Sequence, residues 1–181
     1  MLTFFLAVIF LVITPGPGVL SLAGVGAAYG YRHGTRYITG LWIGHNLVAI
    51  AVVSGLAAIM LAQPRVRTVL ALVSAAYLLW LAYRIAFAGA KVAFIDRPSP
   101  PGIRGGILLQ TINPKAYAVN TAIFANFAFM PDNPALEITI KFAIFNFVWV
   151  IAHGFWLWLG ITIRRLDLPP RTQRAINIGM A

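Results

Sequence analysis

Two short proline-containing stretches hold the residues best suited to chemistry. Thr14-Pro15-Gly16-Pro17 lies inside a charge-free apolar run, and Asn113-Pro114-Lys115 lies near the middle of a later one. Because proline cannot donate the helix hydrogen bond, each stretch should interrupt a helix. Asn113 before Pro114 is a favoured helix start. In the first stretch, either Thr14 or Gly16, each followed by a proline, offers the same arrangement. Each break is therefore predicted to begin a new half-helix.

The start of a helix can bind an anion. Its first N–H groups lack intrahelical partners and lie at the positive end of the helix dipole, which suits a carboxylate. Lys115 adds a positive charge, unless it lies near the membrane surface and extends its ammonium group to water. The predicted substrate-binding residues are therefore Thr14, Pro15, Gly16, Pro17, Asn113, Pro114 and Lys115, with Asn46 added from a neighbouring run.

Several other polar residues lie inside apolar runs. His45 and His153 are candidates for proton coupling because histidine titrates near neutral pH, but each could equally be a core residue bonded to a neighbouring carbonyl. The amides of Asn46, Asn120, Asn126 and Asn146 more often join helices than bind ligands. Small residues that should allow close helix packing are Gly24, Ala27, Ala28, Gly40, Gly44 and Gly55.

The amino-acid composition indicates the kind of fold that positions these residues. Of 181 residues, 60% are hydrophobic and only 10% are charged, whereas about a quarter would be charged in a soluble domain. The chain is therefore predicted to be an all-α, polytopic membrane helix bundle. Its net charge of +10 does not indicate nucleic-acid binding, because the basic residues occur singly or in pairs between apolar runs. There is no cysteine, which excludes disulfides and thiolate sites.

Five runs are candidate membrane spans, which take about 20 apolar residues each. The third, at 68–83, is shorter and can extend toward Ala90 if Arg84 reaches to the membrane surface. Ten Lys and Arg residues fall in the loops at 32–36 and 84–104 and after Ile163, against three on the opposite side. The positive-inside rule places the ten in the cytoplasm and the amino terminus outside. The five predicted spans lie within residues 2–31, 37–64, 68–83, 105–130 and 142–163.

The two proline breaks also suggest an organisation in halves. Residues 1–90 form a first three-helix half, residues 91–104 a cytoplasmic linker rich in proline, and residues 105–181 a second half. The second half is predicted to have two spans and an incomplete third, because residues 174–181, the last in the sequence, look like the first turns of a further span. Broken first and fourth helices in corresponding places are typical of transporters built from inverted repeats.

At this point the sequence resembles the lysine-exporter family, also called the LysE/RhtB amino-acid exporters. The residues that carry the resemblance are Thr14-Pro15-Gly16-Pro17, Gly24 and Gly30, Gly40 and Gly44, Tyr77-Leu78-Leu79-Trp80-Leu81 and Asn113-Pro114-Lys115-Ala116. The resemblance implies an inner-membrane exporter of amino acids or close derivatives, driven by a cation or proton gradient. It also implies a bundle of six helices. This sequence differs from that pattern, because it predicts five spans and an incomplete sixth.

The residue types within the predicted spans favour one class of substrate. Many relatives have an acidic residue where this chain has His45, and no Asp or Glu lies within a predicted span. A cationic side chain would need a buried counter-charge. We therefore predict a small neutral amino acid, or a lactone relative, rather than lysine or arginine. The partners we expect are the lipid bilayer and this substrate, with a homo-oligomer left open.

Three alternatives to transport are an enzyme, a metal-ion exporter and a structural membrane subunit. A membrane-embedded enzyme needs a nucleophile with a base or paired carboxylates, and the spans contain neither motif, so no catalytic residue is predicted. Three histidines, His33, His45 and His153, are too few for a metal cluster, and neither a metal nor another cofactor is predicted. A structural membrane subunit, or a truncated and inactive family member, remains the alternative.

Overall fold

A computed structural model describes residues 1–55, 62–86, 99–165 and 172. The incomplete sixth span and most of the linker predicted at 91–104 lie outside these described residues. Every regular element within them is a helix. These helices are α1 (Leu2–Ile13), α2 (Pro17–Tyr29), α3 (Tyr31–Val53), α5 (Pro64–Ala86), α6 (Ile103–Ile112), α7 (Pro114–Asn126) and α8 (Pro134–Arg165).

Both predicted breaks are present. α1 ends at Ile13 and α2 begins at Pro17, with a bend of 49° between the two helices. Of the two starts that the sequence offered there, the chain uses Gly16 as the N-cap with Pro17 in the first helical position. α6 ends at Ile112, and Asn113 caps α7 as expected.

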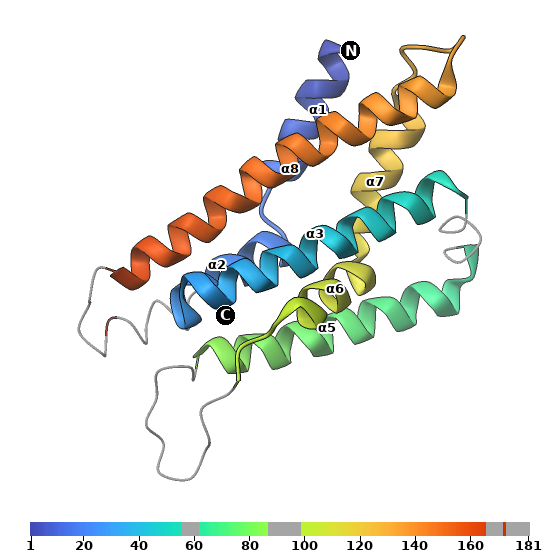
Figure 1. The fold of residues 1–181 in the computed structure, drawn as a ribbon. Coiled ribbons are helices and arrows are strands. Elements are labelled where there is room, and N and C mark those ends of the chain that lie inside the picture. The colour runs from blue at the N-terminus through green and yellow to red at the C-terminus, as the bar shows by residue number, and fades with distance from the viewer. Residues whose placement is uncertain (56–61, 87–98, 166–171, 173–181) are drawn as a thin grey trace.

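The helices are long and apolar enough for a membrane protein. α3, α5 and α8 could each cross a bilayer by length and composition, and the bent pair α1–α2 could form a fourth span. The fourth predicted span, at residues 105–130, is not among them, and the structure divides it into α6 and α7, of 10 and 13 residues. It nevertheless runs from one end of the bundle to the other (Figure 1). The chain is an all-α, polytopic membrane bundle.

The two broken helix pairs run in opposite directions. α1–α2 descends from the end of the bundle that holds the amino terminus, whereas α6–α7 rises toward it (Figure 1). The ends of α2, α5 and α8 and the starts of α3 and α6 lie together at the opposite end. The structure corrects one prediction, because residues 32–36 form the first turns of α3 rather than a loop, with the turn before them at Gly30. The inverted-repeat relation stays a prediction.

Close helix contacts depend on small residues. A Cβ on Gly40 in α3 would lie 2.0 Å from the backbone oxygen of Ile103 at the start of α6, and one on Gly160 in α8 would lie 2.1 Å from that of Ala23 in α2. Gly44 in α3 likewise approaches α6. The packing predicted for Gly40 and Gly44 is confirmed. That for Gly55 is wrong, because Gly55 has a φ of 77° just beyond α3 and a Cβ there would contact nothing in the described residues.

A polar cluster joins α3 to α8 within the apolar bundle. The amides of Asn46 and Asn146 exchange two hydrogen bonds of 3.0 Å, and the Trp42 indole donates to Asn146 at 2.7 Å. Asn46 and Asn146 are thus interhelical contacts, as amides inside a membrane usually are.

A second polar cluster lies at the turn between α7 and α8. The carboxylate of Glu137 pairs with Lys141 at 2.8 Å and accepts the backbone N–H groups of Phe129 and Met130. Both charged side chains are buried, although the sequence placed them in an outer connection. Lys141 also donates to the backbone oxygen of Phe124 at 3.3 Å, a carbonyl in the last turn of α7, where helical partners are missing.

Candidate functional site

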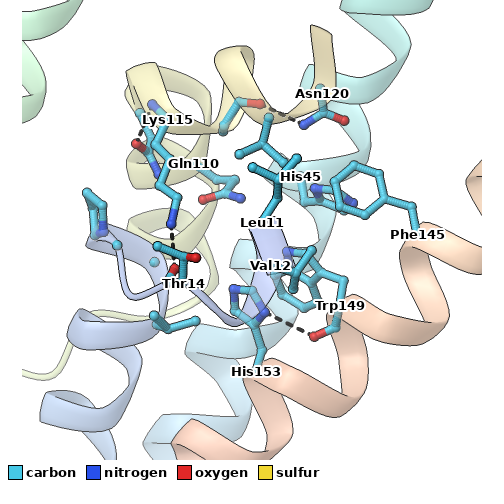
Figure 2. A pocket seen from close by; sticks show the side chains of 17 residues that line it. Leu11, Val12, Thr14, His45, Gln110, Lys115, Asn120, Phe145, Trp149 and His153 are labelled. Atoms are coloured by element: carbon cyan, nitrogen blue, oxygen red, sulfur yellow. Dashed lines mark hydrogen bonds between the residues drawn. The ribbon is translucent and has the colours of Figure 1, made fainter. Parts of the chain in front are cut away.

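The breaks in α1–α2 and α6–α7 face a common cavity. It is lined by residues of α1, α2, α3, α6, α7 and α8. The space between its lining atoms, including the part open to solvent, is about 430 Å³. Figure 2 shows the side chains that surround it. The cavity therefore brings the two helix breaks together with residues of α3 and α8.

The start of α2 is open to this cavity. Gly16, Pro17 and Gly18 line it, and no side chain caps this helix. The start of α7 is closed, because the side chain of Asn113 accepts the backbone N–H of Lys115 at 3.0 Å. The free N–H groups in the first turn of α2 therefore form the better anion site of the two.

Lys115 links the two broken pairs. Its ammonium group donates to the backbone oxygens of Thr14 at 2.5 Å and Pro15 at 3.3 Å, the carbonyls left free where α1 ends. The side chain crosses Gly16, where a Cβ would lie 2.7 Å from the Lys115 Cδ. The cation thus offsets the negative end of the α1 dipole and places its charge beside the start of α2.

Two imidazole rings enclose an indole on another wall of the cavity. The Trp149 ring stacks on His153 at 3.6 Å between centroids and on His45 at 5.4 Å. His153 Nδ1 lies 3.0 Å from the backbone oxygen of Trp149. Since a carbonyl only accepts, that nitrogen carries the proton, and Nε2 is left as the acceptor. A Cβ on Gly18 would lie 3.6 Å from this Nε2.

The structure brings most of the predicted site residues together. Thr14, Gly16, Pro17, His45, Asn113, Lys115 and His153 line the cavity. Pro15 contributes its carbonyl to Lys115, and Pro114 occupies the first position of α7 with an exposed side chain. Asn46 does not join them, because its amide is engaged with Asn146 between α3 and α8.

Sequence reasoning missed several residues of this cavity. Gln110 lies three residues before the Asn113 break, and that spacing on one helix was the available signal. Asn120 was treated as a packing residue, although it lies about two turns into α7 on the same face as Asn113. The remaining missed residues are Leu11, Val12, Gly18, Val19, Ala116, Val119, Phe145 and Trp149.

The charges around the cavity have one sign. Among the residues that the structure describes, the lining includes the cation of Lys115 and no Asp or Glu. Within the described ranges, no three His, Asp or Glu side chains gather as a metal site would require. The rest of the lining is largely apolar. The arrangement suits a small molecule with a carboxylate and an uncharged side chain.

Comparison with known proteins finds a family model and several relatives that match this chain. The family model described as LysE type translocator matches residues 9–181. The cysteine/O-acetylserine efflux protein of Salmonella paratyphi A is 31% identical over 133 residues, which are 73% of this chain and 67% of that protein. The leucine efflux protein of an Enterobacter species is 26% identical over 130 residues, 69% of this chain and 62% of that protein.

A third relative is similar over more of its length. The cysteine/O-acetylserine efflux protein of Escherichia coli O1:K1 / APEC is 23% identical over 169 residues, which are 93% of this chain and 85% of that protein. The matches to the first two relatives extend over about two thirds of those proteins. No solved structure matches the chain.

Proposed function

The chain belongs to the LysE type translocator family, whose members are multi-pass inner-membrane proteins. From this premise we propose that it exports small neutral amino acids. The relatives named for efflux of cysteine, O-acetylserine and leucine support this class of substrate. The observation that carries the proposal is the cavity between the two broken helix pairs, with Lys115 and the open start of α2 on one side.

In this proposal, the start of α2, Lys115 and the apolar wall of the cavity each have a role in binding the substrate. The substrate carboxylate binds at the first turn of α2, near Thr14, Gly16 and Pro17, where it is attracted by the Lys115 ammonium group. Its side chain lies against the apolar wall formed by Val12, Val119 and their neighbours. Alternating access then follows from movement of one half of the chain against the other around this site.

The expected selectivity rests on the described lining of the cavity, which contains no acidic side chain. A lysine or arginine substrate would bring a second positive charge near Lys115 with nothing to neutralise it. In proteoliposomes preloaded with unlabelled leucine, labelled leucine and O-acetylserine are expected to enter by counterflow, and lysine is not. Empty liposomes serve as the control. Preferential exchange of lysine would contradict the proposed substrate class, and exchange of no amino acid would contradict the function.

We also propose that export is coupled to protons through His153. Its Nε2 borders the cavity beside Gly18, while its Nδ1 is held by the Trp149 carbonyl, so a proton gained at Nε2 faces the substrate path. Replacing His153 with glutamine preserves a side chain that can donate to that carbonyl. Leucine transport driven by a pH gradient is expected to fall at least about tenfold relative to counterflow, which needs no net proton movement. An unchanged ratio of the two rates would exclude His153 from coupling.

A further inference from the structure

Three buried polar atoms on the cavity wall lack hydrogen-bond partners among the described residues: His45 Nε2, Gln110 Oε1 and Asn120 Oδ1. The exposed fractions of these side chains are 1%, 6% and 1%. Buried polar groups in folded proteins are almost always paired, so each unpaired group requires an explanation. All three line the same cavity, although they come from three different helices. The common explanation is an occupant of the cavity.

The three unpaired atoms indicate which hydrogen-bonding groups this occupant must have. The oxygens of Gln110 and Asn120 are acceptors only, so they need donors. The orientation of the Asn120 amide is set by its nitrogen, which donates to the backbone oxygen of Ala116 at 2.8 Å and leaves the oxygen free. His45 Nε2 is a third acceptor when the ring proton is on Nδ1. Figure 2 shows these side chains around the cavity.

Among the residues that the structure describes, no cation contacts these acceptors. The ammonium group of Lys115 is bound to the Thr14 and Pro15 carbonyls. His153 Nδ1 is bound to the Trp149 carbonyl. An ammonium group has three N–H donors and a positive charge, and hydrogen bonds that involve a charge are the stronger ones. It therefore matches the acceptors better than a neutral group does.

The acceptors also lie at the right place relative to the carboxylate site. A Cβ on Gly18, in the first turn of α2, would lie 3.4 Å from Gln110 Oε1. The N–H groups that would bind a carboxylate are thus adjacent to this oxygen. In an α-amino acid the two charged groups are attached to one carbon atom, so both can be bound at neighbouring positions.

We propose that Gln110 and Asn120, assisted by His45, bind the α-ammonium group of the substrate. The cavity then selects zwitterions with a free amino group next to the carboxylate. This inference rests on the proposed function and specifies how the same site recognises its substrate. Analogues that lack the amino group or carry it acylated leave the buried oxygens unpaired.

The first test uses the wild-type protein and leaves the fold unchanged. Binding of labelled leucine to purified protein is competed with unlabelled leucine, with 4-methylpentanoate, which lacks the amino group, and with N-acetylleucine. We expect both analogues to compete about 10- to 100-fold more weakly than leucine, as for loss of hydrogen bonds to a charged group. Equal competition by 4-methylpentanoate would overturn the proposal.

The second test assigns the effect to residues. Asn120→Leu and Gln110→Met remove the acceptors with little change in volume and should reduce the preference for leucine over 4-methylpentanoate about tenfold or more. Asn126→Leu is the matched control, because Asn126 is in the same helix and bonds its own turn at Ala122 but is exposed outside the cavity. This control should retain the wild-type preference.

The outcomes separate the two proposals. If the wild type exchanges leucine but both variants keep its preference for the amino group, the ammonium site is wrong and the exporter proposal stands. If the wild type neither binds nor exchanges any amino acid, both are overturned. A variant that binds no ligand is checked by size-exclusion chromatography. If it has aggregated, the analogue competition on the wild type decides.

Discussion

Replacing Lys115 with alanine is expected to abolish amino-acid export without preventing membrane insertion. The variant removes the Lys or Arg charge that the described lining of the cavity contains, and with it the attraction for a substrate carboxylate. Hydrogen bonds to charged groups contribute about 1.5–3 kcal/mol, which corresponds to roughly a 10- to 100-fold loss of affinity. Because the membrane interior strengthens such interactions, we expect export at or below about 1% of the wild-type rate. Efflux of labelled leucine from preloaded cells measures it.

Lys115 has a structural role that this experiment must separate from binding. Its ammonium group also satisfies the free carbonyls of Thr14 and Pro15, so alanine could weaken the break between α1 and α2. Lys115→Gln retains a donor for these carbonyls, on a side chain that is one bond shorter, and removes the charge. Arg36→Gln, on the exposed surface of α3, is the control for loss of a cation elsewhere. Wild-type export by a folded Lys115→Gln protein would remove Lys115 from the substrate site.

Replacing Gly40 with alanine is expected to have the largest effect on folding. The added Cβ would lie 2.0 Å from the Ile103 oxygen and 2.8 Å from its carbonyl carbon, and a backbone cannot move aside as a side chain does. α3 and α6 must therefore separate. Overpacking typically costs about 1–3 kcal/mol, and contact with backbone places this variant at or above the upper end. Thermal unfolding in detergent, followed by size-exclusion chromatography, measures the loss.

The control for this variant is Gly154→Ala. Gly154 also lies inside a long helix, α8, but a Cβ there meets no described atom within 4 Å. Alanine favours a helix over glycine by roughly 0.5–1 kcal/mol, so this protein should be as stable as the wild type or more so. If Gly40→Ala unfolds at the same temperature as Gly154→Ala, the close approach of α3 and α6 is wrong.

The packing of α3 on α6 also positions the candidate site. Gly44, one turn beyond Gly40, would place a Cβ 2.8 Å from the Cβ of Gln110. The short separation of these helices is therefore what brings Gln110 beside the start of α2. A variant that separates them is expected to lose substrate recognition together with stability.

Much of the fold could be predicted from local chemistry. Proline and the residue before it restrict the backbone wherever they occur, so the breaks before Pro17 and Pro114 were predictable without a structure. The membrane class followed from the scarcity of charge. Helix ends were less predictable: Arg32 and Arg36 looked like loop residues because they are charged, yet nothing in their backbone chemistry prevents a helix, and α3 begins at Tyr31.

The site was predictable only where a residue lies at a break. Thr14, Gly16, Asn113 and Lys115 were identified because an interrupted helix leaves backbone groups free close to them in sequence. Asn46 and Asn120 looked alike as amides inside apolar runs. Their different roles depend on their neighbours, since Asn46 meets Asn146 across α3 and α8, whereas the oxygen of Asn120 meets only the cavity.

The sequence by itself determined that this is a membrane protein with two interrupted helices and a positive charge at one of them, because composition, proline and capping act within a few residues. Only the tertiary structure decided that both interruptions face one cavity, that Lys115 of α7 binds the end of α1, and that Gln110, Asn120 and His45 meet there. These contacts join residues far apart in the chain. They depend on how closely the helices pack, which Gly40 and Gly160 allow and which no local pattern specifies.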